Sequence, residues 1–201
     1  MLKSQEINVV KFNWCANHFF HKECVEAGFK GEYLKCPVCF LIYGEFIGDM
    51  PTGTLSWEKS SEYECEGYED IDTWILNYDF ANGVWNGVPY RGTGRTAYLP
   101  DNTEGREVLC LLIKCFWRQH TFTVGTSVTT GRSNVVVWNS IHHKTSPNGG
   151  VLSYGYPDPT YLNRVKLELA DKGIVIEEGD KPDEISDSGT IHVVNKNDKN
   201  E

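Results

Sequence analysis

The first quarter of the chain holds four of its seven cysteines, with two histidines among them. The six residues are Cys15, His18, His21, Cys24, Cys36 and Cys39, and the last two form a C-x2-C pair. Zinc takes four tetrahedral nitrogen or sulfur ligands, and a C-x2-C pair supplies two of them from one tight turn. Cysteines and histidines that only fill a core would be scattered along the chain. The spacing therefore predicts a small zinc-bound module near the N-terminus.

Length and charge limit the classes of protein to which the chain can belong. Its 201 residues, 40% hydrophobic and 12% aromatic, suit one medium domain and a small one. The net charge of −9 argues against nucleic acid or an anionic membrane surface as a primary partner. We find no apolar run of about 20 residues and no signal peptide, so we expect a cytoplasmic and possibly nuclear protein with reduced cysteines. The remaining cysteines, Cys65, Cys110 and Cys115, are interpreted as buried small hydrophobes.

A joint rich in glycine and proline, residues 41–53, separates the N-terminal module from a larger domain. Residues 54–57 and 73–80 have strand composition, and a capping signal at Asn102–Thr103 begins a helix. A second helix is predicted over about 160–172, and the glycine-dense segment 81–95 is predicted to be loop. The expected organisation is a zinc module over 1–47, a domain over 53–177, and a disordered acidic tail over 178–201.

Residues 122–159 are the stretch most typical of a binding site. A hydroxyl-rich loop lies between Gly125 and Gly131, and a β-branched run leads to the pair His142-His143. Glycines allow the backbone to approach a ligand, and loop hydroxyls with backbone N–H groups bind phosphate or ribose oxygens. The alternative is a hairpin whose serines and threonines satisfy only their own turn.

The Cys/His spacing resembles the later part of a RING finger, whose ligands alternate between two zinc ions. By that resemblance Cys15, His18, Cys36 and Cys39 hold one zinc, and His21 with Cys24 forms half of the second site. The sequence departs from the RING pattern by one extra residue between Cys15 and His18 and by the lack of a C-x2-C pair before Cys15. We expect the second site to be empty, completed by another group, or cut off in a truncated gene model.

The larger domain resembles the Deltex C-terminal domain over about residues 53–176. The resemblance rests on ordered segments: GYED, TWILNYDF, YLPDNTEGREVLCLL, FTVGTS, VVWN, IHHKT and GYPDP. It implies a small, N-terminally incomplete, zinc-bound RING-like module followed by an α+β Deltex C-terminal domain. In this family the pair acts as a RING-type E3 ubiquitin ligase, which takes ubiquitin from a ubiquitin-conjugating enzyme (E2) and modifies protein substrates, including ADP-ribosylated ones. Members are also reported to ADP-ribosylate the ubiquitin C-terminus. Notch signalling is an association of the family.

The resemblance also implies a groove for ADP-ribose or NAD, so Zn²⁺ and this nucleotide are the expected cofactor and ligand. The implied ligand-binding residues are Gly125, Thr126, Ser127, Trp138, His142, Tyr154 and Tyr156. Glu168 is at the position of the family's catalytic glutamate, with His142 as its candidate catalytic partner. A carboxylate there suits a general base or a ribose anchor. Without the resemblance, Glu168 would be interpreted as a solvated helix residue.

Two departures bear on activity. Val128 replaces a serine of the family loop, and Tyr154 replaces the histidine that the family pairs with its glutamate. A tyrosine hydroxyl ordinarily has a pKa of about 10 and is a poor proton shuttle at neutral pH. The alternative to an active ligase is therefore a catalytically impaired module that binds ADP-ribose or ubiquitin-pathway partners. A nucleotide hydrolase is disfavoured, because no Walker lysine follows the glycine-rich loop.

Overall fold

The computed structural model describes residues 8–12, 15 and 17–195. The chain divides into two compact units, Met1–Phe46 with Asp171–Gly173, and Ile47–Ala170 with Ile174–Glu201. The division falls inside the predicted joint. None of the described helices combines the length and apolar character that a membrane crossing requires.

The N-terminal unit is small and has two β-hairpins. Strand β1 (Val9–Lys11) pairs with β2 (Phe19–His21), helix α1 (Lys22–Gly28) follows, and β3 (Tyr33–Lys35) pairs with β4 (Ile42–Gly44). Its buried side chains, among the residues described, are those of Cys15, Leu34, Cys36 and Ile42. A unit of this size cannot bury enough apolar surface to be stable by that means alone, so it needs a metal or an equivalent cross-link.

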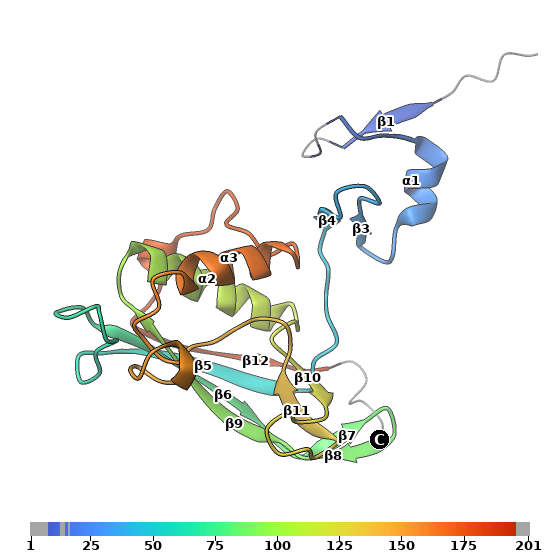
Figure 1. Ribbon diagram of the computed structural model, residues 1–201. Helices are drawn as coiled ribbons and strands as arrows, with labels where there is room; N and C mark the ends of the chain where they lie inside the picture. The colour runs from blue at the N-terminus through green and yellow to red at the C-terminus, as the bar shows by residue number, and fades with distance from the viewer. Residues whose placement is uncertain (1–7, 13–14, 16, 196–201) are drawn as a thin grey trace, which may run out of the picture. The chain divides into compact units, whose positions relative to one another are not determined.

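The larger unit has a four-stranded antiparallel sheet in the order β12–β5–β6–β9. Its strands are β5 (Gly53–Ser60), β6 (Thr73–Phe80), β9 (Thr93–Pro100) and β12 (Ser188–Val193). Helices α2 (Thr103–Trp117) and α3 (Tyr161–Ala170) lie together on one face of this sheet (Figure 1). Two hairpins, β7 (Gly83–Trp85) with β8 (Val88–Tyr90) and β10 (Phe122–Gly125) with β11 (Val135–Trp138), complete the strands, and η1 (Val151–Ser153) and η2 (Pro182–Glu184) are short 3-10 turns.

Local sequence explains the two central elements. Six of the eight residues of β6 are buried, as expected for an apolar strand with sheet neighbours on both sides and helices above it. Helix α2 begins at the predicted cap, where the side chain of Asn102 accepts a hydrogen bond from the N–H of Gly105. Its buried residues, including Val108, Leu112 and Phe116, form one apolar face that packs in the core. The predicted strand over 73–80 and the predicted helix from 103 are confirmed.

The segment 81–95 is not the loop that we predicted. It contains β7, β8 and the start of β9. The turn between β7 and β8 is Asn86-Gly87, and both residues have positive φ, 50° and 79°. An Asn-Gly pair between strand-forming residues is a strong hairpin signal, and the overall density of glycine hid it.

The prediction of a disordered tail over 178–201 is wrong for its described part. Strand β12 pairs with β5 along six residues, from Ser188 opposite Glu58 to Val193 opposite Gly53. The acidic residues before it are ion-paired: Asp180 lies 2.7 Å from Lys114, Asp183 lies 3.1 Å from Arg106, and Asp187 also pairs with Lys59. Each of these carboxylates is paired with a lysine or arginine of the larger unit. An acidic composition in this segment therefore does not indicate a disordered, solvated chain. Residues 196–201 lie outside the described part of the chain.

Aromatic rings stack beneath the loop that follows β11. Phe122 stacks on Trp138 and Trp138 on His143, with ring centroids 4.2 Å apart in each pair. Tyr78 meets Trp138 and His143 edge-on. Nδ1 of His143 lies 3.1 Å from the carbonyl of Ile141 and Nε2 lies 2.9 Å from the hydroxyl of Tyr78. A carbonyl only accepts, so Nδ1 carries the proton and Nε2 accepts from Tyr78.

Removal of β12 should destabilise the larger unit. A chain that ends after Ser186 loses the burial of Val193 and the pairing with β5, which we expect to lower the free energy of unfolding by at least about 2 kcal/mol. Urea denaturation followed by tryptophan fluorescence measures this change. A chain that lacks only residues 196–201 is the control. Equal stability of the two truncated chains would contradict the pairing.

Acidification should destabilise the domain through His143. Burial lowers the pKa of this side chain to about 4, a hydrogen bond to Ile141 opposes the shift, and the neighbouring His142 adds to it. The unfolded chain takes up the proton near pH 6.5, so stability is full above that pH and is lost as the pH falls towards 4. The loss should reach about 3 kcal/mol. Urea denaturation at several pH values should show a shallower pH slope for His143→Gln, and an unchanged slope would contradict the assignment.

Candidate functional site

Four of the six predicted metal ligands come together in the N-terminal unit. The ligand atoms of Cys15, His18, Cys36 and Cys39 all lie within 4.8 Å of one another. Sγ of Cys15 lies 3.2 Å from Sγ of Cys39, and Sγ of Cys36 lies 3.6 Å from Nδ1 of His18. A tetrahedral zinc with ligand bonds of about 2.0–2.3 Å requires separations of roughly this size. The donor set therefore fits one zinc ion.

Local backbone geometry favours the thiolate form of Cys36, the form in which cysteine binds zinc. Cys36 directly follows β3, and its carbonyl accepts a hydrogen bond from the N–H of Phe40, which closes the turn around the C-x2-C pair. Burial opposes the charged form of Cys36, but backbone hydrogen bonds from Cys39 and Val38 outweigh it and lower its pKa to about 6. The hydroxyl of Tyr43 donates to Sγ of Cys15 at 2.9 Å, which favours the thiolate, but burial outweighs this contact and raises the pKa of Cys15 to about 11.

The structure does not bring His21 and Cys24 to this cluster. His21 is the N-cap residue of α1 and Cys24 lies within that helix, and both side chains are exposed. Their assignment to half of a second site stays a prediction.

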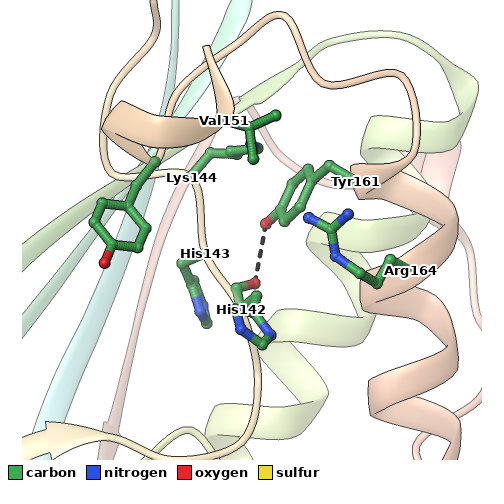
Figure 2. A pocket seen from close by; sticks show the side chains of 7 residues that line it. His142, His143, Lys144, Val151, Tyr161 and Arg164 are labelled. Atoms are coloured by element: carbon green, nitrogen blue, oxygen red, sulfur yellow. Dashed lines mark hydrogen bonds between the residues drawn. The ribbon is translucent and has the colours of Figure 1, made fainter. Parts of the chain in front are cut away.

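Two cavities in the larger unit meet at the loop that follows β11. One has a volume of ≈ 550 Å³ and is lined by Arg95, Val128, Thr129, Trp138 and Asn139, among others. The other has a volume of ≈ 300 Å³ and is lined by Lys144, Val151, Tyr161 and Arg164 (Figure 2). His142, His143 and Tyr154 line both. The two cavities are therefore compartments of one groove.

His142 and Glu168 form a bidentate contact beside the groove. Nδ1 of His142 lies 2.7 Å from Oε1 of Glu168, and the backbone N–H of His142 donates to Oε2 at 2.8 Å. The carbonyl of the same residue accepts a hydrogen bond from the hydroxyl of Tyr161 at 3.2 Å, drawn as the dashed line in Figure 2. The ring remains 68% exposed. A carboxylate that orients an exposed imidazole leaves Nε2 able to accept or deliver a proton, the arrangement of a general base and its orienting partner.

The hydroxyl-rich loop between Gly125 and Gly131 lies next to the groove. Only Val128 and Thr129, at the tip of this loop, line the larger cavity. Thr126 shares a hydrogen bond with Ser133 at 3.1 Å, and Oγ of Ser127 accepts from the N–H of Thr130 at 3.2 Å. Gly125, Thr126 and Ser127 line neither cavity, whereas Val128 lines the larger one and is fully exposed. Without a ligand, these hydroxyls satisfy their own turn, as the hairpin alternative expected.

The aromatic candidates have different positions. Trp138 lines the larger cavity, and Tyr154, 68% exposed, lines both. Tyr156 is fully buried and lines neither, because its hydroxyl donates to the carbonyl of Tyr98 at 3.0 Å. It is a core residue beneath the loop.

Sequence reasoning missed Arg95, Lys144 and Arg164. Arg164 could have been found, since it precedes Glu168 by four residues and therefore lies on the same face of a helix. Arg95 lies on β9, in the segment that we predicted to be loop, and no local pattern marks it.

Comparisons with known proteins agree with this organisation. The family model described as "Deltex C-terminal domain" matches residues 47–174. The human protein named "Probable E3 ubiquitin-protein ligase DTX3" is 45% identical over 164 residues, which cover 78% of this chain and 47% of that protein. The Xenopus laevis protein named "E3 ubiquitin-protein ligase DTX1" is 40% identical over 173 residues, covering 80% and 28%, and mouse "E3 ubiquitin-protein ligase DTX4" is 36% identical over 178, covering 83% and 29%.

The chain spans about half or less of the length of these relatives. The family match nevertheless covers more than half of the chain and includes both walls of the groove, the loop after β11 and helix α3. The chain therefore belongs to the Deltex family.

Proposed function

We propose that this protein acts as a RING-type E3 ubiquitin ligase of the Deltex type, taking ubiquitin from an E2 and passing it to protein substrates. The observation that carries the proposal is the four-ligand cluster of Cys15, His18, Cys36 and Cys39 directly before a Deltex C-terminal domain. The names of the relatives support the same activity. A zinc ion there would cross-link β3 and the segments before it, and so hold the surface that meets the E2.

The C-terminal domain is proposed to bind ADP-ribose or NAD in the groove. The larger cavity is of the size expected for a small-ligand site. Arg95 offers it a cation, and Trp138, on which Phe122 and His143 stack, forms part of its wall. Glu168 orients the imidazole of His142, which is proposed to hydrogen-bond a ribose hydroxyl or to take its proton. The roles proposed here for His142 and Glu168 agree with those that the family resemblance implies.

A second candidate function is a binding module with impaired catalysis. It is favoured by Tyr154, which lines both cavities in place of the family's histidine, and by the apolar Val128 at the rim. In this candidate the groove still holds its ligand, and His142 is its exposed imidazole, since His143 is buried.

Zinc content and ubiquitin transfer should fall together. We expect one zinc per chain, and Cys36→Ser with Cys39→Ser should release it and unfold the N-terminal unit, since structural zinc contributes its binding free energy to folding. Elemental analysis measures the metal, and discharge of ubiquitin from a charged E2 measures transfer. Cys110→Ser, at a free cysteine of helix α2 outside the cluster, is the control. A full-length chain that carries no zinc, or discharge unaffected by the double change, would overturn the proposal.

ADP-ribose affinity should depend on His142. Loss of its hydrogen bond in His142→Ala should weaken binding about tenfold, and Val128→Ser should tighten it by adding a hydroxyl at the rim. Tyr154→His should raise turnover more than affinity, because imidazole acts as an acid or base. His192→Ala, on β12, is the control and should change nothing. Equal ADP-ribose affinity of His142→Ala and the unchanged chain, measured by calorimetry, would show that the ligand does not bind in this groove.

A further inference from the structure

The floor of the smaller cavity is a buried ion cluster. Lys144 and Asp158 are both almost fully buried, and Nζ of Lys144 lies 2.7 Å from Oδ2 of Asp158. The same Nζ donates to the carbonyl of Gly155 at 2.7 Å. NH2 of Arg164 reaches the same carboxylate oxygen at 3.0 Å. Two cations therefore share a single carboxylate.

The carboxylate is fully engaged by these partners. Its other oxygen, Oδ1, accepts from the N–H and the hydroxyl of Thr160 at 3.2 Å and 2.9 Å. Burial alone would raise the pKa of Asp158, but hydrogen bonds from Lys144, Arg164 and Thr160 hold it well below its usual range. The carboxylate of Glu168 does not line the cavity, and both of its oxygens accept hydrogen bonds from N–H groups of His142. The cluster of Lys144, Arg164 and Asp158 thus keeps an excess positive charge at the cavity.

Arg164 presents the donors through which that charge can act. A guanidinium has five N–H groups, and two of them are used on Asp158 and on the hydroxyl of Thr160, the latter at 2.8 Å. None of the other described residues accepts a hydrogen bond from this side chain, which is 42% exposed. Figure 2 shows the guanidinium beside the ring of Tyr161 at the edge of the cavity. Its orientation is therefore fixed by two contacts, while three donors stay available.

We propose that the smaller cavity is a subsite for an anionic group, a carboxylate or a phosphate, held by Arg164 and supported by the buried charge of Lys144. A planar fork of N–H groups matches two oxygens of either anion, and Arg164 does not have to be ordered on binding. The volume of ≈ 300 Å³ admits a small group, and Val151 with the ring of Tyr154 offers an apolar wall for the stem that carries the anion. A cation is disfavoured by the excess positive charge.

This subsite occupies the smaller compartment of the groove and does not depend on nucleotide binding in the larger one. Lys144 and Arg164 line the smaller cavity and not the larger one, whereas His142 and Tyr154 line both. Two sources supply the required chemistry: a phosphate of a nucleotide that crosses between the compartments, or the free C-terminal carboxylate of a peptide.

The test is an NMR titration of the full-length chain at constant ionic strength with inorganic phosphate, with acetylated dialanine, and with the amide of the same peptide. The backbone N–H signals of His142 and Tyr154 and the Nε–H signal of Arg164 report on the cavity. Arg164→Gln removes the fork, Arg164→Lys keeps the charge without the fork, and Lys166→Gln is the matched control. Lys166 lies on the same helix but pairs with Glu107 at 3.1 Å, outside the cavity.

We expect saturable shifts that weaken about tenfold in Arg164→Gln, less in Arg164→Lys, and not at all in Lys166→Gln. Binding of phosphate but not of the peptide would identify the nucleotide as the source, and preference for the peptide acid over its amide would identify a chain terminus. No saturation at tens of millimolar, or equal binding by Arg164→Gln, would overturn the proposal. If ADP-ribose does not bind but phosphate still binds at Arg164, the proposal of a nucleotide groove is wrong and the proposal of the anion subsite is supported.

Discussion

The ion pair between Lys144 and Asp158 determines the geometry of the groove. It joins the residue directly after the histidine pair to the segment just before α3, across the loop between them. Breaking a buried pair by removing one partner leaves an uncompensated charge and typically costs about 3–5 kcal/mol. The loop is therefore fixed at both ends, and its position relative to α3 is determined by the same contact.

The other contacts of the groove follow from that position. The N–H of Tyr98 on β9 donates to the carbonyl of Lys144, which attaches the loop to the edge of the sheet. The hydroxyl of Tyr161 reaches the carbonyl of His142, so the first turn of α3 and the histidine face each other. Glu168, two turns further along the helix, then meets both the ring and the backbone of His142. The loop thus presents the exposed imidazole of His142 beside the stacked rings of Trp138 and His143.

The elements that could be predicted are those with a strong local pattern. The apolar run of β6, the cap of α2 and the C-x2-C turn each follow from neighbouring residues, and each is found where the sequence indicated. The strand β12 could not be predicted in this way, because the acidic segment that precedes it is stabilised by lysines and arginines distant in sequence. The site shows the same contrast. The family resemblance located His142 and Glu168, whereas Lys144 and Arg95 enter the groove only through tertiary contacts.

The central claim is that the loop after β11 and helix α3 form one ligand groove organised by His142 and Glu168. A crystal structure of the full chain with ADP-ribose tests it most directly. The account predicts ligand density in the larger cavity, within hydrogen-bonding distance of His142 and beside Arg95, with the contact between His142 and Glu168 intact. Density for ADP-ribose elsewhere on the domain, or a bound complex in which His142 has turned away from Glu168, would contradict it.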